Sequence, residues 1–309
     1  MAVRGGGHNV AGLAGADQAV TIDLSRMRNV RVDPVQRHVR VEAGALLGHV
    51  DRATQAFQLV VPTGVVSETG IAGLILSGGL GWLRRKWGRT CDNLIAADLV
   101  CADGAHHRVS CTEQPELLWA LRGGGGNFGI VTAFEFQAHP LGPDVMFCFV
   151  VYPDNPELMA RYADFIATEP EEIGTLAFTG TVPAADTFPR DSWGCPFFVV
   201  AACYAGSVAE GQRALQPLRE LGTPIADLSA AMPFVEAQKF LDEEYPTAGT
   251  ITGNPFISGS SLQRSSIFFE TSATGRLLLS PPSTSGQWVV HSQGSVRMTV
   301  PWRHDRLHS

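Results

Sequence analysis

The residues best suited to chemistry stand almost at the start of the chain, where three consecutive glycines precede a histidine and an asparagine. This stretch reads VRGGGHN, with Arg4 before the glycines and His8 after them. Glycine tolerates backbone angles at which successive N–H groups point inward at the oxygens of an anion such as a phosphate. Arg4 would add positive charge to that cradle and His8 an imidazole. The alternative is a flexible N-terminal tail.

Three more glycine clusters follow: PTGVVSETGIAG at 62–73, SGGLGW at 77–82 and RGGGGNFG at 122–129. The last contains the GxGxxG spacing of a dinucleotide-binding turn, at Gly124, Gly126 and Gly129. That fingerprint requires a strand before the glycines and a helix after them. Here the pattern predicts a helix before and the strand IVTAFEF after, so we reject a Rossmann site. Four glycine turns beside strands indicate one long polyanionic ligand lying on backbone amides.

The elements that must position these turns fall into two groups. In the first group, AVTIDL and HVRVEAG alternate as strands do, and ALLGHVDRATQAF has helical spacing. LIAADLVCADG predicts a strand that ends in a turn. TEQPELLWALR predicts a helix with Thr112 as its N-cap and Pro115 in its first turn.

The second group starts near residue 144 and has the order β-α-β-β-α-β, followed by a helix over MPFVEAQKFLDEEYP. That order is the split βαβ layout, a sheet with helices on one face. The sequence therefore predicts an α+β protein with domains at 1–141 and 142–248 and a tail at 249–309. A length of 309 residues also suggests two domains.

Composition excludes several classes of protein. The net charge of −7 and the lack of a basic stripe argue against a nucleic-acid partner. We expect no membrane partner, because no apolar run reaches a span's length, and a cytoplasmic location, because the N-terminus lacks an apolar signal segment. The six cysteines contain no CxxC pair, so we interpret them as small core residues rather than disulfide or metal ligands, and we expect no metal site. The histidines at 38, 49, 106, 107 and 139 look like surface or turn residues.

The ordered glycine motifs resemble the PCMH-type FAD-binding domain of the vanillyl-alcohol oxidase superfamily, and most closely its berberine bridge enzyme-like FAD-linked oxidases. The resemblance covers VRGGGHN, residues 62–104 and LLWALRGGGGNFGIVTAFEF, and continues more weakly into VVAACYAG and PFVEAQKFLD. It implies FAD as the cofactor and a ferredoxin-like α+β substrate domain after the FAD-binding domain.

The resemblance also implies a set of site residues. His8 stands where the family bonds a histidine to the flavin 8α-methyl group; the alternative is a turn histidine that is hydrogen-bonded locally. Val66 stands where some members have a second, cysteine link, so no second link is expected. Leu74 replaces a histidine of many members. The implied cofactor contacts are Arg4, Gly5, Gly6, Gly7, His8, Asn9, Thr63, Gly64, Val65, Ser67, Thr69, Gly70, Gly73, Gly78, Gly79, Gly81, Asn127, Ile130, Val131 and Thr132.

The implied activity is oxidation of a small organic substrate by hydride transfer to flavin, with dioxygen the expected electron acceptor. Neither the catalytic base nor the substrate follows from the sequence. The competing interpretation is an inactive remnant that binds no cofactor stably.

Both ends depart from the family's pattern. Family members carry a further lobe before RGGGHN, and we expect that lobe to be absent here, leaving the FAD-binding domain incomplete. After FLDEEYP the family continues with Tyr-Tyr-Trp-Lys-Ser, whereas this chain reads GTITGNPFISG. A nucleotide sequence that we wrote to encode this stretch also encodes the family's continuation when it is read in a second frame. We therefore expect 249–309 to be out-of-frame sequence; the alternative is a divergent tail.

Overall fold

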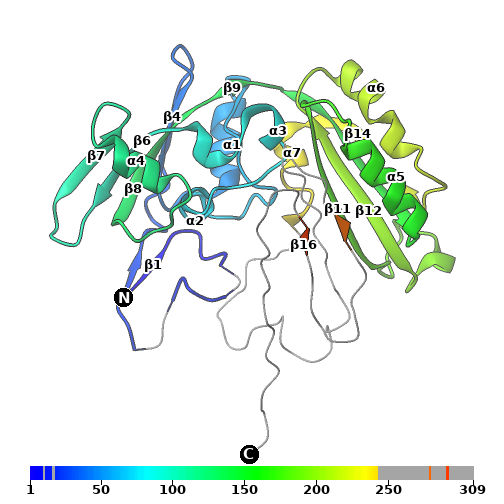
Figure 1. Ribbon diagram of the computed structural model, residues 1–309, viewed down its shortest axis with the longest axis horizontal. Helices are drawn as coiled ribbons and strands as arrows, with labels where there is room; N and C mark the ends of the chain where they lie inside the picture. Colours follow the sequence, from blue (N-terminus) through cyan, green and yellow to red (C-terminus); the bar gives the residue numbers. More distant parts are fainter. Residues whose placement is uncertain (10, 16–17, 243–277, 280–289, 292–309) are drawn as a thin grey trace, which may run out of the picture.

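The computed structural model describes residues 1–9, 11–15, 18–242, 278–279 and 290–291. In Figure 1 these residues form two α/β lobes side by side, with the N-terminus on the first lobe. The expectation that 249–309 is out-of-frame sequence lies outside the described residues, apart from the paired strands β15 (Leu278–Leu279) and β16 (Val290–His291). No helix among the described residues has the length and apolarity that crossing a membrane requires.

The first lobe is built on a five-stranded antiparallel sheet in the order β3-β4-β8-β6-β7. Its strands are β3 (Val30–Asp33), β4 (His38–Glu42), β6 (Leu94–Val100), β7 (His106–Ser110) and β8 (Ile130–Gln137). Two short pairs flank it: β1 (Ala2–Arg4) runs parallel to β2 (Thr21–Asp23), and β5 (Leu59–Val60) pairs with β9 (His139–Pro140). Its helical elements are α1 (Leu47–Gln55), α2 (Ile71–Leu76), α3 (Arg84–Trp87), the 3-10 turn η1 (Thr90–Asn93) and α4 (Pro115–Leu121).

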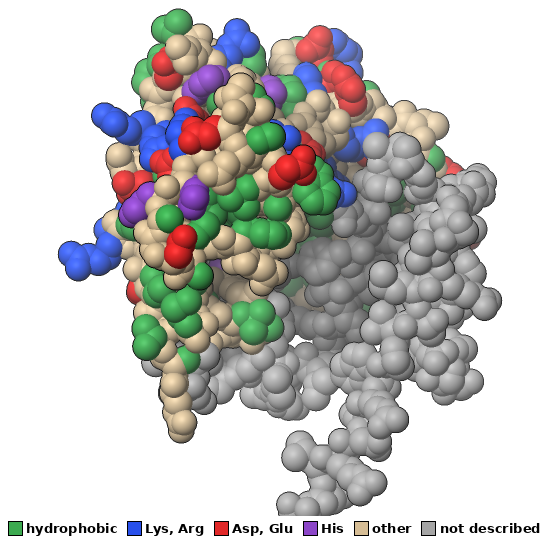
Figure 2. Space-filling view, turned by 60° about the vertical axis from the view of Figure 1, so that its left-hand side comes forward, with side chains coloured by type: hydrophobic (Ala, Val, Ile, Leu, Met, Phe, Trp, Pro, Cys, Tyr) green, Lys and Arg blue, Asp and Glu red, His purple; other side chains and the backbone are tan. Residues whose placement is uncertain are grey.

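Strand alternation gives this sheet one apolar and one charged face. Val39 and Val41 of β4 are fully buried and pack with Phe134 and Phe136 of β8 against α1, α2 and α4. On the opposite face, Arg40, Asp98, Arg108 and Glu135 form a chain of ion pairs. Figure 2, which brings the left-hand side of Figure 1 forward, shows acidic and basic side chains interspersed.

The second lobe has the order β-α-β-β-α-β that the sequence predicts. The antiparallel sheet runs β11-β12-β10-β13, with β14 also pairing β10. Helices α5 and α6 cover one face of it (Figure 1). The elements are β10 (Asp144–Pro153), α5 (Pro156–Ile166), β11 (Ile173–Thr181), η2 (Arg190–Ser192), β12 (Pro196–Tyr204), α6 (Val208–Arg219), β13 (Ala226–Asp227), β14 (Ala230–Pro233) and α7 (Phe234–Ala237).

One apolar cluster belongs to both lobes. Trp82 and Leu83 of the first lobe pack with Phe147 of β10 and Phe234 of α7, and the Trp82 and Phe147 rings meet edge to face at 5.1 Å. Such a continuous core couples the two lobes far more firmly than a polar interface would.

Some local predictions were wrong at the level of single elements. Helix α4 begins at Pro115 with Gln114 as its N-cap, not Thr112, because the Ser110 hydroxyl accepts the N–H groups of Thr112 and Glu113 in a turn. The helix expected from residue 232 is only the four-residue α7, after which the chain continues as tight i+3 turns to Asp242.

The expected strand over PIADLSAAM is divided into β13 and β14. Between these strands the Ser229 hydroxyl accepts the Phe149 N–H, which interrupts the backbone ladder.

The core assignment of the cysteines holds for Cys91, Cys148 and Cys203, which are buried free thiols, whereas Cys111 and Cys195 are exposed. Among the residues described, no group of three His, Cys, Asp or Glu side chains is placed to hold a metal ion.

Candidate cofactor site

The first glycine segment lies directly on the second. Strand β1 leads into Gly5–Gly7, and a Cβ added at Gly6 would lie 2.4 Å from the Gly70 Cα. The reciprocal contact is equally close, since a Cβ at Gly70 would lie 2.4 Å from the Gly6 nitrogen. Real side chains do not fit at such distances, so the RGGGHN and SETGIAG segments can meet only because both positions are glycine.

The second and third segments meet at Gly81. A Cβ there would lie 1.6 Å from the Thr63 carbonyl oxygen and 3.0 Å from that of Gly64. On its other side Gly64 faces Leu47 and Leu74. Leu74, which stands where many family members have histidine, therefore fills apolar space behind this loop.

The third segment contacts the fourth. The Gly125 N–H donates to the Leu76 carbonyl oxygen at 2.8 Å, and Gly123 approaches the backbone of Gly78. Helix α4 precedes the fourth segment and strand β8 follows it, which is the reverse of a dinucleotide-binding turn, as the sequence predicts. The tertiary structure thus brings all four glycine segments into one continuous region.

Backbone donors remain available along this region. The N–H groups of Gly6, Gly7 and His8 have no acceptor among the described residues, and neither do those of Gly79 and Gly81, which are buried residues. Most N–H groups of buried residues are paired in native proteins, so the unpaired ones of Gly79 and Gly81 are typical of a site that receives acceptor oxygens, whereas Gly6, Gly7 and His8 are partly or fully exposed. The donor set therefore fits a polyphosphate cofactor such as FAD.

The side chains of the first segment have different roles. The half-buried His8 ring has no hydrogen-bond or ion-pair partner in the described part of the chain, so the local hydrogen bond of the alternative interpretation is not found. Arg4 folds over Gly7 and lies 4.0 Å from Asp23, with both side chains about half exposed. A backbone hydrogen bond from Ser25, with a smaller contribution from Arg4, lowers the pKa of Asp23. Asn9 closes a turn by accepting the Ala11 N–H.

Several predicted contact residues direct their side chains elsewhere. Val131 is buried in the first lobe's core, Ile130 packs against that core, and Val65 packs against the cluster that joins the lobes. The Thr132 hydroxyl donates to the Asp98 carbonyl oxygen. Val131 could therefore meet a cofactor only through its backbone atoms, whereas the other three side chains remain partly exposed.

The remaining positions divide by exposure. Gly73 and Asn127 are exposed, and nothing would contact a Cβ added at Gly73. Thr69 is half-buried, and its carbonyl oxygen accepts the Leu47 N–H.

Sequence reasoning missed the residues that hold the second glycine segment from the other lobe. Gln238 donates to the Thr63 hydroxyl, and the Asp242 carboxylate accepts from Ser67. Their only signal was the weak resemblance of PFVEAQKFLD, which carries no spacing that predicts a contact with residues 175 positions earlier.

It also missed a run of three cations, Arg84, Arg85 and Lys86, that crosses from α3 to the second lobe. Their side chains donate to the carbonyl oxygens of Thr175, Glu169 and Ala205, respectively. Arg85 also pairs with the Glu169 carboxylate at 3.0 Å.

His139 corrects the expectation of a surface or turn histidine. Its ring stacks on Trp87 at 4.9 Å, and its Nε2 lies 2.6 Å from the Asn93 side-chain oxygen. Burial, with a smaller contribution from Arg37, lowers the pKa of His139. His49 is also structural: it accepts the Leu46 N–H at the start of α1, and burial followed by the charge of Arg52 lowers its pKa.

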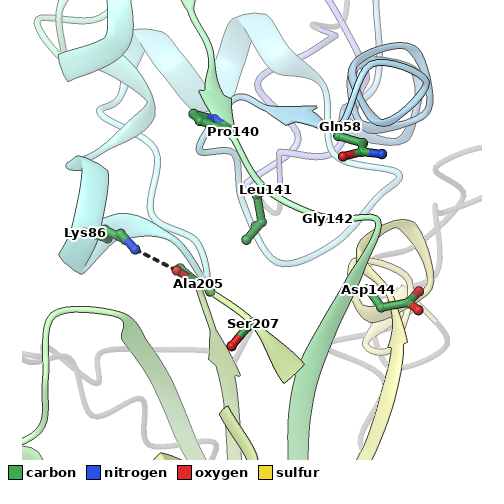
Figure 3. A pocket seen from close by; sticks show the side chains of 9 residues that line it. Gln58, Lys86, Pro140, Leu141, Gly142, Asp144, Ala205 and Ser207 are labelled. Carbon is green, nitrogen blue, oxygen red and sulfur yellow. Dashed lines mark hydrogen bonds between the residues drawn. The ribbon is translucent and has the colours of Figure 1, made fainter. Parts of the chain in front are cut away.

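A shallow cavity of about 320 Å³ lies where the lobes meet, away from the glycine segments (Figure 3). It is lined by Gln58, Lys86, Pro140, Leu141, Gly142, Asp144, Ala205, Gly206 and Ser207. Lys86 donates to the Ala205 carbonyl oxygen at 2.8 Å. This hydrogen bond engages the one cation among the described residues that line the cavity. No lining residue belongs to the four glycine segments, so this cavity is separate from the candidate cofactor site.

Comparisons with known proteins agree with this arrangement. Residues 1–110 match the family of FAD binding domains. The chain is 33% identical to an FAD-linked oxidoreductase of Dictyostelium discoideum over 74% of this chain and 48% of that protein. It is 31% identical to (R)-6-hydroxynicotine oxidase of Paenarthrobacter nicotinovorans over 76% of this chain and 50% of that protein.

Among solved structures, 6-hydroxy-D-nicotine oxidase from Arthrobacter nicotinovorans superposes with a TM-score of 0.70 at 30% identity, covering 82% of this chain and 54% of that one. The chain spans about half the length of the relatives it matches. Residues 1–110 thus carry an FAD-binding domain of this family, and about three quarters of the chain is similar to FAD-linked oxidoreductases.

Proposed function

We propose that this chain carries the cofactor-binding part of an FAD-linked oxidase that acts on a small organic molecule. The observation that carries the proposal is the meeting of four glycine segments with unpaired backbone donors at Gly6, Gly7, His8, Gly79 and Gly81. When bound, FAD accepts a hydride from a substrate carbon and passes the electrons to an acceptor, here dioxygen. The oxidase relatives support that choice of acceptor.

The chain's own residues would hold FAD in three ways. Backbone N–H groups of the glycine segments bind phosphate oxygens, and Arg4, about half exposed beside Gly7, adds positive charge. His8 would attach the flavin covalently: an imidazole nitrogen would replace one hydrogen of the flavin 8α-methyl group, with the proton released and the two electrons passed through the flavin to dioxygen. No described residue engages this imidazole. A second link is excluded at Val66, which has no nucleophile and is only 6% exposed within the apolar cluster.

The first prediction concerns His8. We expect the full chain, incubated with FAD and precipitated with acid, to retain flavin absorbance in the washed pellet. His8→Ala should bind FAD reversibly and release all of it into the supernatant, because alanine cannot bond the flavin. His106→Ala is the matched control, since His106 is an exposed histidine on β7 and belongs to none of the four glycine segments.

Two outcomes would contradict this function at different levels. Flavin that stays in the His8→Ala pellet would move the covalent link to another residue. A wild-type chain that is folded by circular dichroism but binds no FAD in pellet or solution would support the competing interpretation, a remnant without cofactor binding.

A further inference from the structure

The loop 63–70, which the proposed function places against the cofactor, is fastened from the opposite lobe at Ser67. Asp242 lies in the turns after α7, and its carboxylate accepts the Ser67 N–H at 2.7 Å and the Ser67 hydroxyl at 2.5 Å. On the other side, the Ser67 carbonyl oxygen accepts the Gly48 N–H at 2.8 Å. Ser67 is thus held between α1 and the second lobe.

Gln238 fastens the start of the same loop. Its side-chain Nε2 lies 3.0 Å from the Thr63 hydroxyl, 3.1 Å from the Gly64 carbonyl oxygen and 3.1 Å from Asp51 Oδ2. Gln238 and Asp51 are each 1% exposed and Thr63 is 3% exposed, so water does not compete for these contacts. Gly81 closes the other side of Thr63 and Gly64.

Three acceptors compete for the Gln238 amide in this buried cluster. An amide nitrogen has two hydrogens, yet three acceptors surround that of Gln238. Asp51 Oδ1 and Gln238 Oε1 are both buried and have no partner. A proton on Asp51 removes the charge that makes its carboxylate the strongest of these competing acceptors, which leaves the two amide hydrogens of Gln238 to Thr63 and Gly64.

We propose that Gln238 and Asp242 are positioning residues that hold the 63–70 loop in the shape that receives FAD, and that a neutral Asp51 carboxyl keeps the Gln238 amide directed at that loop. The role assigned toward FAD rests on the proposed function, whereas the effect on the loop itself does not. Neither residue touches the cofactor; both act through Thr63, Gly64 and Ser67.

The electrostatics of Asp51 agree with this geometry. Burial raises the pKa of Asp51 to about 7; the hydrogen bond from Gln238 opposes that rise and the charge of Asp242 adds to it. The described residues place several charged groups on α1 and on the elements packed against it. Of these, Asp242 is the one whose charge raises the pKa of Asp51. The others are His49 and Arg52 on α1, Arg31 and Asp33 on β3, and Glu236 and Lys239 in and after α7, while β5 carries none.

The raised pKa of Asp51 determines how stability changes with pH. Because folding raises the pKa of Asp51, the stability that its neutral form contributes is complete at acidic pH and is lost as the pH rises through about 7. Above that pH the carboxylate draws one Gln238 hydrogen away from the loop.

The first experiment tests the loop without FAD. Hydrogen exchange is measured on the full apo chain for Asp242→Ala, Asp242→Asn and the control Glu236→Gln, whose native side chain pairs, among the described residues, with Lys239 on the surface. We expect Asp242→Ala to exchange the Ser67 N–H about tenfold faster, since a hydrogen bond to a charged group is lost. Asp242→Asn, which keeps an acceptor and gains a donor, should restore most of that protection, and Glu236→Gln should not change it.

Unchanged Ser67 protection in Asp242→Ala would overturn the proposal. If Asp242→Ala does not fold, the double variant Asp242→Asn/Ser67→Ala is compared with the wild type instead. Equal protection of the N–H at position 67 in these two chains would also overturn the proposal.

The second experiment uses FAD and pH. All variants are made in the His8→Ala chain, which binds FAD reversibly, and we expect the FAD dissociation constant of this parent chain to rise roughly fivefold between pH 6 and pH 8.5, as about one hydrogen bond to the loop is given up. Asp51→Asn, which stays neutral and keeps a donor, should remove that rise, and Gln238→Leu should weaken FAD binding at both pH values. Parallel pH profiles in the His8→Ala parent and its Asp51→Asn variant would overturn the role of Asp51. If the wild type binds no FAD at all, the proposed function fails, while the exchange result still decides whether the loop is held as described.

Discussion

Replacing Arg85 with methionine is expected to destabilise the chain by about 2 kcal/mol at pH 8, because the buried Glu169 must then take up a proton or stay charged without its counter-charge. The Glu169 side chain is 0% exposed, and Arg85 Nη1 lies 3.0 Å from its Oε1. Neither Glu169 carboxylate oxygen has an aligned hydrogen bond, so the ion pair is its main compensation. Arg85 also donates to the Glu169 carbonyl oxygen at 2.9 Å, and methionine would lose this bond too.

The loss should depend on pH in a defined direction. Burial raises the pKa of Glu169 to about 7, against the charges of Arg85 and Arg84, which lower it. Glu169 is therefore neutral in the folded chain at pH 5, and stability is lost as the pH rises through about 7. Without Arg85 the pKa rises further, so urea unfolding should show a small difference between variant and wild type at pH 5 and the full difference at pH 8.

Glu169→Gln is the partner variant that separates charge from packing. The double variant Arg85→Met/Glu169→Gln should recover much of the stability lost in Arg85→Met at pH 8, because no buried charge remains. An Arg85→Met loss that is equal at pH 5 and pH 8 would show that Arg85 acts through its hydrophobic stem and its bond to the backbone instead.

Gly81→Ala is expected to be the most damaging single methyl addition in the first lobe, costing more than about 4 kcal/mol or preventing folding. The new Cβ would lie 1.6 Å from the Thr63 carbonyl oxygen and 2.7 Å from its carbon, so the obstacle is backbone rather than a flexible side chain. Neither segment has room to move, because the next residue, Trp82, is fixed in the apolar cluster that joins the lobes and Gln238 holds Thr63 from behind. Soluble yield and urea unfolding would measure the effect.

Gly73→Ala is the matched control within the same set of motif glycines. Gly73 lies in α2, and nothing lies within 4 Å of an added Cβ, so alanine should stabilise the helix by about 0.5–1 kcal/mol. Equal unfolding free energies for Gly81→Ala and Gly73→Ala would contradict the close packing of the glycine segments.

The sequence predicted the second lobe's element order because strand alternation and helical spacing are local properties. It also placed α4 and β8 on the correct sides of the RGGGGNFG turn, which was enough to reject a Rossmann site. Element ends were less predictable, since they depend on particular hydrogen bonds. The Ser110 hydroxyl moved the start of α4 to Pro115, and Ser229 divided the last strand into β13 and β14.

The glycine motifs show what a sequence pattern can predict and what only the tertiary structure reveals. Their number and order indicated a cofactor that lies on backbone amides, but the pattern could not say which glycines face a ligand and which face another chain segment. At Gly6, Gly70 and Gly81 the neighbour that excludes a side chain is the protein's own backbone.

The sequence by itself determined the kind of protein: an α+β chain whose residues 1–110, which include three of the four glycine segments, match an FAD-binding domain. Only the tertiary structure decided which residues hold those segments in place. Gln238, Asp242 and Arg85 act on partners 84 to 175 positions away in the chain. Contacts at that separation arise from the packing of two sheets through a shared apolar core, and no local period or spacing in a single sequence encodes them.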